Sequence, residues 1–347
     1  MSNARVAIVT GSSRGIGRAV ALQLAKDGHS VVINYQSNAS KAQEVVDEIH
    51  STTQSRAISV QGDVGVLANG ARLIKETLDA FGRIDVVVFN AAWIVYQSIT
   101  EVTEESYEEA FRTNVKAPMF FTQQLIPHLT TGGRLIFLST SLTSISTITP
   151  NYFLYTATKG AIEQMTRTLA RDLGRKGVTV NCVNPGATDT DGFRHGKTEQ
   201  QIQFFAGQSP IGRLGQPEDI AGAISFVASE QAKWVNGQIL RVNGGMAVEI
   251  HFFSHTNASR IHTTTTSRAV AVHGDLAILA DGATLVKEAL AVVGRIDVAV
   301  INAALVAFDS LSNVTEESFE QVFGMNVKWR EIAPGSTARS YVCYRRL

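Results

Sequence analysis

The sequence predicts a doubly wound α/β fold, in which a parallel sheet is covered by helices on both faces. Short runs of β-branched residues alternate with stretches of helical periodicity from the N-terminus onward. The expected strands are apolar along nearly their whole length, which is typical of parallel strands buried on both faces. Apolar residues make up 44% of the chain and charged residues 18%, so the composition excludes a disordered chain and a coiled coil.

The elements follow one another in a regular order along the first two thirds of the chain. The first helix is expected over 15–28, because Ile16, Val20 and Leu24 recur at helical spacing. A long helix is expected over 104–129. Further helices are expected over 39–49, 67–81 and 153–173, and strands over 5–10, 30–34, 57–60, 84–90, 134–138, 178–184 and 238–242. Right-handed crossovers between such strands place a ligand at their carboxyl ends.

The charge balance and the cysteine count exclude several classes of function. The 31 basic and 31 acidic side chains give a net charge of zero, and no block of Lys and Arg indicates a nucleic-acid partner. Cys182 and Cys343 are too few for a disulfide framework, and the His residues show no ligand spacing, so we expect no catalytic metal. Cys182 lies in an apolar strand and is expected to be a core residue. The N-terminus reads as a strand and no apolar run has the length of a membrane span, so we expect a cytoplasmic protein without a membrane partner.

The C-terminal part of the chain contains a partial internal repeat. Residues 262–328 align with residues 50–116 at a constant offset of 212, and 37 of the 67 pairs are identical. We therefore expect a complete domain over 1–247 and a truncated duplicate of about 31–116 over 248–347. The duplicate has no glycine-rich loop and no Tyr-x-x-x-Lys pair, so we expect it to be catalytically silent.

A glycine-rich loop lies between the first strand and the first helix. It reads Thr-Gly-Ser-Ser-Arg-Gly-Ile-Gly over residues 10–17. Its glycines permit a tight turn and let backbone N–H groups approach a pyrophosphate at the helix N-terminus. After the first strand of a doubly wound pattern, such a loop predicts a dinucleotide site.

The end of the second strand indicates which dinucleotide is bound. An Asp or Glu at this place accepts hydrogen bonds from the ribose 2′-hydroxyl and favours NAD. This chain has Asn34 and Ser37 there and no carboxylate, and Arg14 in the glycine-rich loop can bind a 2′-phosphate. The missing acid and the added base both favour NADP(H).

A tyrosine and a lysine, Tyr155 and Lys159, stand four residues apart on one face of the helix expected over 153–173. A phenol alone holds its proton too tightly to exchange it readily near neutral pH, and a neighbouring ammonium lowers the phenol pKa. The pair is therefore a candidate acid/base. A surface tyrosine packed along a lysine stem has the same spacing.

Together these motifs resemble the short-chain dehydrogenase/reductase family over residues 1 to about 247. The resemblance implies a Rossmann-type fold, a Ser–Tyr–Lys triad extended by Asn114, and a homo-oligomer that the C-terminal extension would perturb. The matching motifs are the loop at 10–17, Asp63-Val64, Asn90-Ala-Ala92, Asn114, Tyr155, Lys159, Asn184-Pro-Gly186 and Val242-Asn-Gly-Gly245. The expected cofactor contacts are Gly11, Ser13, Arg14, Ile16, Gly17, Asn34, Ser37, Asp63, Val64, Asn90, Ala91, Tyr155, Lys159, Pro185, Gly186, Thr188 and Thr190.

The position of the catalytic hydroxyl is open between three neighbours. Counting back from Tyr155 favours Ser141, whereas counting along the strand from Gly133 reaches Thr140. Ser139 shares a face with Ser141 by strand alternation. We favour Ser141, with Ser139 and Thr140 as alternatives.

The resemblance implies a reductase that transfers a hydride from NADPH to a ketone. Tyr155 would be the acid/base, Lys159 would hold the nicotinamide ribose and lower the pKa of Tyr155, and Asn114 would fix a water. The chain is similar to acyl-carrier ketoreductases and hydroxynaphthalene reductases, which indicates a polyketide or aromatic ketone from secondary metabolism. Two alternatives keep the same fold: an NADP-linked alcohol dehydrogenase and a non-catalytic cofactor-binding scaffold. The segment 191–208 is expected to cover the substrate as a lid.

Overall fold

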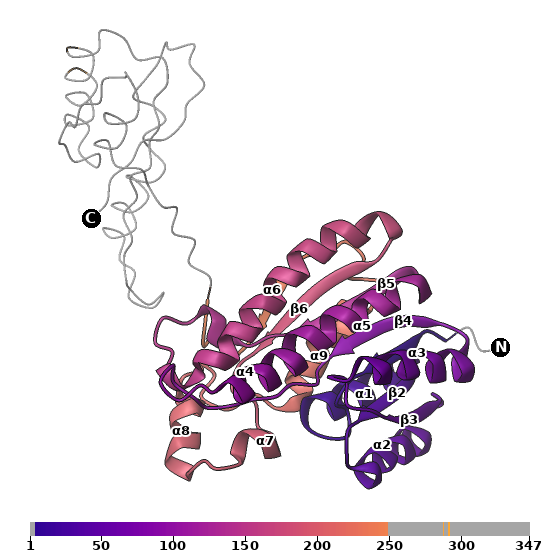
Figure 1. Ribbon diagram of the computed structural model, residues 1–347, viewed down its shortest axis with the longest axis horizontal. Helices are drawn as coiled ribbons and strands as arrows, with labels where there is room; N and C mark the ends of the chain where they lie inside the picture. The colour runs from indigo at the N-terminus through magenta and orange to yellow at the C-terminus, as the bar shows by residue number, and fades with distance from the viewer. Residues whose placement is uncertain (1–3, 249–286, 288–290, 292–347) are drawn as a thin grey trace, which may run out of the picture. The chain divides into compact units, whose positions relative to one another are not determined.

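A single parallel sheet organises the described part of the chain. The computed structural model describes residues 4–248 together with Lys287 and Ala291, so the expected duplicate over 248–347 lies outside the described residues apart from its first residue and those two positions. The strand order is β3-β2-β1-β4-β5-β6-β7 (Figure 1). The strands are β1 (Val6–Val9), β2 (Ser30–Tyr35), β3 (Ala57–Gln61), β4 (Ile84–Phe89), β5 (Leu129–Leu138), β6 (Thr179–Pro185) and β7 (Ile239–Val242).

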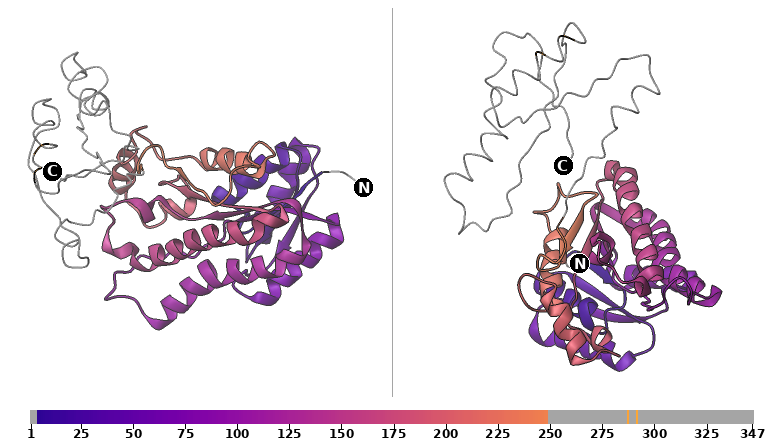
Figure 2. Two further views of the ribbon diagram at one scale, coloured as in Figure 1. Left: turned by 90° about the horizontal axis from the view of Figure 1, so that it is seen from above. Right: turned by 90° about the vertical axis from the view of Figure 1, so that its left-hand side faces the viewer.

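Helices cover both faces of this sheet, which confirms the doubly wound architecture (Figure 2). One face carries α1 (Gly15–Lys26), α2 (Ala39–Thr52) and α9 (Pro217–Ala228), and the other carries α3 (Leu67–Phe81), α5 (Ala117–Leu125) and α6 (Phe153–Leu173). The strands supply both cores by alternation, since Ala7 and Val9 join the first and Ile8 joins the second. Three shorter helices are α4 (Glu104–Phe111), α7 (Asp191–Arg194) and α8 (Glu199–Gly207). Among the described residues, no helix combines the length and apolar character needed to cross a membrane.

The centre of the sheet is where the chain changes direction. β1 pairs with β2 on one side and with β4 on the other, both in parallel. The chain therefore winds outward in two directions from the gap between β1 and β4. Loops that follow these two strands diverge, and in such sheets a ligand binds at the carboxyl ends of the strands beside this gap.

The region predicted as one helix over 104–129 is built from several pieces. A π-helical turn at Arg112–Lys116 separates α4 from α5. β5 starts at Leu129 rather than at Arg134, because Leu129 pairs with Ile84 of β4 at an irregularity of the ladder. Helical periodicity reveals neither a turn with an extra residue nor a pairing with a distant strand. α9 is a further helix that is not among the elements predicted from the sequence.

Candidate active site

A cavity of about 530 Å³ opens at the carboxyl ends of the strands. All the residues expected to contact the cofactor line this cavity, except Gly17. The catalytic candidates Ser139, Thr140, Ser141, Tyr155 and Lys159 line it as well. The fold thus brings together residues that are separated by more than half of the described chain.

The glycine-rich loop is folded tightly against the end of β4. Gly11 and Gly15 have φ angles of +62° and +57°, in the left-handed region that favours glycine. A Cβ at Gly17 would lie 2.5 Å from Nδ2 of Asn90, so glycine is required there for close packing. The first turn of α1 has neither a capping side chain nor an acidic residue, which leaves its N–H groups available to an anion. This cradle fits a pyrophosphate.

Two of the residues expected to contact the cofactor, Asn34 and Asp63, use their side chains for hydrogen bonds within the protein. Asn34 is buried, and its Oδ1 accepts from the N–H of Gly11 at 3.2 Å while its Nδ2 donates to two backbone carbonyls at 3.3 and 3.0 Å. The carboxylate of Asp63 accepts from Arg112 at 2.9 Å and from the N–H of Gly65 at 2.8 Å. Both residues line the cavity, but their polar side-chain atoms are bonded within the chain.

Two cations border the end of the cavity beside β2. Arg14 is exposed, and within the described part of the chain it makes no ion pair. Lys41, in the first turn of α2, forms an ion pair of 3.8 Å with Asp191 of α7. Lys41 is not among the site residues predicted from the sequence. Its position four residues after Ser37, at the start of the helix that follows the second strand, is the signal that could have found it.

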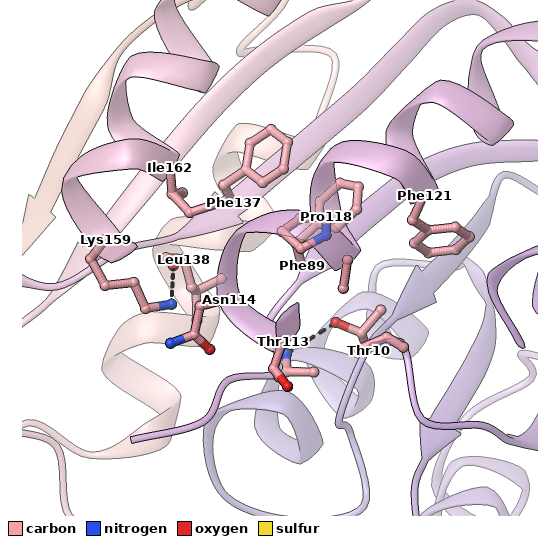
Figure 3. A pocket seen from close by; sticks show the side chains of 13 residues that line it. Thr10, Phe89, Thr113, Asn114, Pro118, Phe121, Phe137, Leu138, Lys159 and Ile162 are labelled. Atoms are coloured by element: carbon pink, nitrogen blue, oxygen red, sulfur yellow. Dashed lines mark hydrogen bonds between the residues drawn. The ribbon is translucent and has the colours of Figure 1, made fainter. Parts of the chain in front are cut away.

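Tyr155 and Lys159 share one face of α6 and are almost fully buried, with 8% and 3% of their surfaces exposed. Nζ of Lys159 donates to the carbonyl oxygen of Leu138 at 2.8 Å (Figure 3) and lies 5.7 Å from the centre of the Tyr155 ring. Burial penalises the ammonium form and lowers the pKa of Lys159 to about 8. The lysine can therefore take up and release a proton close to neutral pH.

The pKa of Tyr155 moves in the direction opposite to the one predicted from the sequence. Burial raises it above its usual range, and the neighbouring Tyr96 and Tyr152 raise it further. A hydrogen bond with the side chain of Thr140 opposes this rise. The spacing of Tyr155 and Lys159 does not reveal how completely the phenol is buried, which is why the sequence-based expectation fails here.

The three candidate hydroxyls have different partners. Ser141, the one favoured from the sequence, donates at 3.1 Å to a carbonyl of β6 and accepts at 3.0 Å from an asparagine side chain after β7. Ser139 donates to Oε1 of Glu163 at 2.9 Å. Oγ1 of Thr140 accepts from the N–H of Leu142 at 3.3 Å, and Thr140 is the one of the three that lowers the pKa of Tyr155. The assignment of the catalytic hydroxyl stays a prediction. Because the Ser141 hydroxyl is bonded to groups other than Tyr155, we take Thr140 as the candidate for the proposal below.

Asn114 lies in the π-helical turn and borders a second, smaller pocket rather than the large cavity. Its side chain exchanges hydrogen bonds of 2.7 and 2.8 Å with the backbone of Trp93 and donates to Thr158 at 3.1 Å. The small pocket has a volume of about 10 Å³ and is shared with Lys159 (Figure 3). This is close to the space needed for one water molecule.

The wall of the large cavity beyond Tyr155 is apolar and aromatic. It includes Ile94, Tyr96, Leu142, Tyr152, Phe193, Phe205 and Met246. The rings of Tyr96 and Tyr152 meet edge to face at 5.4 Å, and Nζ of Lys197 lies 4.7 Å from the ring centres of both Tyr96 and Phe193. The segment 191–208 thus borders the cavity through Phe193 and Phe205, while Phe204 is exposed.

Cys182 is a core residue, as predicted. It is fully buried in β6, and burial together with the nearby carboxylate of Glu163 raises its pKa to about 12. The thiol is therefore protonated and is not a nucleophile. Within residues 4–248, no three His, Cys, Asp or Glu side chains lie close enough to hold a metal ion.

The fold and this cleft define a dinucleotide-dependent oxidoreductase. A family profile described as enoyl-(acyl carrier protein) reductase matches residues 11–247. The chain belongs to the short-chain dehydrogenase/reductase family. This confirms the resemblance indicated by the sequence motifs.

Several known proteins are similar to this chain. The hydroxynaphthalene reductase-like protein Arp2 from Metarhizium anisopliae is 40% identical over 253 residues, which cover 70% of this chain and 94% of that protein. A probable tetrahydroxynaphthalene reductase from Zymoseptoria tritici is 38% identical, with 69% and 93% covered. A short-chain dehydrogenase from Burkholderia cenocepacia in complex with NADP has a TM-score of 0.66 and 34% identity, with 70% and 97% covered. The angucycline C-6 ketoreductase LanV with bound NADP has a TM-score of 0.66 and 33% identity, with 70% and 95% covered.

Proposed function

We propose that this protein is an NADPH-dependent carbonyl reductase that acts on a fused aromatic or polyketide-derived ketone. The observation that carries the proposal is the buried set of Thr140, Tyr155 and Lys159 at the edge of a cavity with an aromatic wall. The names of the relatives support it, since two are named after hydroxynaphthalene or tetrahydroxynaphthalene reductases and a structural neighbour is named an angucycline C-6 ketoreductase.

The residues of the cleft fit a nicotinamide dinucleotide that carries a 2′-phosphate. The glycine-rich loop and the first turn of α1 would hold the pyrophosphate, and Lys159 would hold the nicotinamide ribose. Arg14 and Lys41 would bind the 2′-phosphate, and no carboxylate follows β2 to oppose it. When bound, the reduced nicotinamide supplies the hydride.

Tyr155 would donate the proton that completes the reduction. A new C–H bond forms at the carbonyl carbon, the C=O π pair moves to oxygen, and the phenol O–H breaks to give the alcohol O–H. Burial raises the pKa of Tyr155, so the phenol is protonated near neutral pH and carries the proton that the reduction needs. Thr140 would donate a hydrogen bond to the same carbonyl oxygen and polarise it.

Lys159 and Asn114 would return a proton to Tyr155 after each turnover. The pKa of Lys159 near 8 allows it to pass a proton in either direction, and the pocket of about 10 Å³ beside Asn114 has room for the water that continues the path. The aromatic wall would select a flat, fused-ring substrate, because ring faces and edges pack well against Tyr96, Tyr152 and Phe193.

The test is turnover by the purified full-length protein, measured as loss of NADPH absorbance with a bicyclic benzo-fused ketone, 2-tetralone, and a linear ketone, 2-octanone. We expect faster turnover of 2-tetralone, and a decrease of at least about 100-fold in kcat for Tyr155→Phe. Tyr107→Phe is the matched control, because Tyr107 is an exposed tyrosine of α4. Full activity of Tyr155→Phe would refute this mechanism.

The same preparation separates the two alternatives. Faster initial rates with an alcohol and NADP than with the ketone and NADPH would indicate an alcohol dehydrogenase. Tight NADPH binding without turnover of any carbonyl would indicate a cofactor-binding scaffold.

A further inference from the structure

We propose that Glu163 is a positioning residue, which holds Thr140 in its place on the wall of the cavity that Tyr155 also lines. The inference rests on the proposed function, since it concerns the hydroxyl that would polarise the substrate carbonyl. Glu163 is not among the catalytic residues implied by the family resemblance.

Glu163 belongs to the same face of α6 as the acid/base pair. It follows Tyr155 by eight residues and Lys159 by four, so the three side chains are stacked along the helix. Glutamates on amphipathic helices are usually exposed, but Glu163 has 9% of its surface exposed. A carboxylate at such a position is costly unless its oxygens are hydrogen-bonded.

One oxygen of Glu163 collects three hydrogen bonds from two other elements. Oε1 accepts from Oγ of Ser139 at 2.9 Å, from Oγ1 of Thr143 at 2.6 Å and from Nδ2 of Asn184 at 2.6 Å. The other oxygen lies 4.0 Å from the guanidinium of Arg167, which is half exposed. Glu163 therefore connects α6 to the segment that follows β5 and to the end of β6.

Two of these donors also bind the backbone of Thr140. The carbonyl oxygen of Thr140 lies 2.8 Å from Oγ1 of Thr143 and 3.2 Å from Nδ2 of Asn184. Thr143 has one hydroxyl proton, which serves Glu163 and the Thr140 carbonyl as alternative acceptors, whereas the amide of Asn184 has a proton for each. Ser139, the residue before Thr140, is bonded to the same carboxylate oxygen. Thr140 is thus fixed on both sides by groups that Glu163 anchors.

Two substitutions of Glu163 can show whether the residue acts through its hydrogen-bonding oxygen or through its negative charge. Glu163→Gln keeps an amide oxygen that can accept from the same three donors and removes the charge. Glu163→Leu removes the acceptor and leaves its three donors, of which Ser139 and Asn184 are buried, without it. Arg167→Gln is the matched control, because it changes the partner of the other oxygen and leaves the three hydrogen bonds in place.

The experiment measures kcat and KM for 2-tetralone, the affinity for NADPH by fluorescence titration, and unfolding in urea. For Glu163→Leu we expect kcat to fall at least about tenfold with NADPH affinity unchanged, because Thr140 moves from its place on the cavity wall while the cofactor contacts remain. Glu163→Gln and Arg167→Gln are expected to stay within about threefold of the parent kcat. Parent kcat in Glu163→Leu, or an equal loss in Glu163→Gln, would overturn the proposal.

Two further measurements keep the inference separate from the proposed function and from folding. If the parent protein turns over no ketone, the proposed function fails, and a crystal structure of Glu163→Leu still tests the inference: an unmoved Thr140 would overturn it. If Glu163→Leu does not fold, Thr143→Val is compared with Thr143→Ser, which keeps the hydroxyl. We expect a kcat at least about threefold lower for Thr143→Val than for Thr143→Ser, and equal values would overturn the proposal.

Discussion

Replacing Lys159 by methionine is expected to stabilise the protein near neutral pH while abolishing its turnover. The ammonium is almost fully buried, and burial lowers the pKa of Lys159 from its ordinary value of 10.5 to about 8. This lowering of the Lys159 pKa corresponds to about 3 kcal/mol, by which charged Lys159 disfavours the folded state. Loss of the hydrogen bond to Leu138 in Lys159→Met costs about 1 kcal/mol, so the net gain in the free energy of unfolding is about 2 kcal/mol.

The lowered pKa of Lys159 makes the free energy of unfolding increase with pH. Between about pH 8 and pH 10.5, Lys159 binds a proton in the unfolded chain but not in the folded protein. Its contribution to stability is therefore fully present above pH 10.5 and is lost as the pH falls through about 8. Methionine does not titrate, so Lys159→Met lacks this pH-dependent change in stability.

Urea unfolding followed by circular dichroism at several pH values from 7 to 10.5 provides the assay. The quantity compared is the free energy of unfolding of the parent minus that of Lys159→Met. The contributions of the other groups that titrate in this range are the same in both proteins and cancel. We expect the variant to be the more stable at pH 7 and the difference to shrink as the pH rises. A variant that is less stable at pH 7, or a difference that does not change with pH, would refute the reasoning.

Three further predictions address the remaining parts of the site. Thr140→Val is expected to lower kcat for 2-tetralone at least about tenfold, and Ser141→Ala is expected to leave kcat within about threefold of the parent value. The reason is that Thr140 lowers the pKa of Tyr155 whereas the Ser141 hydroxyl is bonded elsewhere. A larger loss in Ser141→Ala than in Thr140→Val would instead indicate Ser141 as the catalytic hydroxyl. Arg14→Gln and Lys41→Gln are each expected to weaken binding of adenosine 2′,5′-bisphosphate about tenfold in calorimetry without affecting 5′-AMP, and equal losses for both nucleotides would contradict a role at the 2′-phosphate. Lys197→Met is expected to raise the KM for 2-tetralone about threefold and to speed proteolysis within 191–208, since it removes a cation shared by two rings; unchanged values of both would show that this contact does not hold the segment.

The sequence predicts those parts of the fold that depend on local pattern. The bounds of α3 (Leu67–Phe81) and α6 (Phe153–Leu173) agree with the prediction, because a periodic apolar stripe and a clear break define each end. The start of β5 at Leu129 depends on pairing with β4, and no local pattern contains that information. The same holds for the π-helical turn, whose side chains have ordinary helical periodicity.

The residues of the candidate site also fall into those that local sequence pattern predicts and those that it does not. The glycine-rich loop, Tyr155 and Lys159 are found from spacing alone, since each motif is continuous along the chain. Glu163 looks like a solvent-facing helical residue, and its burial results from the packing of α6 against the ends of β5 and β6. Thr140 is distinguished from its neighbours by the direction of a turn, which strand alternation does not specify.

The π-helical turn at Arg112–Lys116 has a consequence for insertions and deletions. A π-helical turn accommodates one more residue than an α-helix would hold, while the helices on either side keep their phase. Deleting Val115 would therefore leave Phe121 and Leu125 of α5 packed in the core, but would remove the local geometry that holds Asn114 against Trp93. At this turn the number of residues has little bearing on whether the chain folds. It decides whether Asn114 keeps its hydrogen bonds to Trp93, on which the proposed proton path depends.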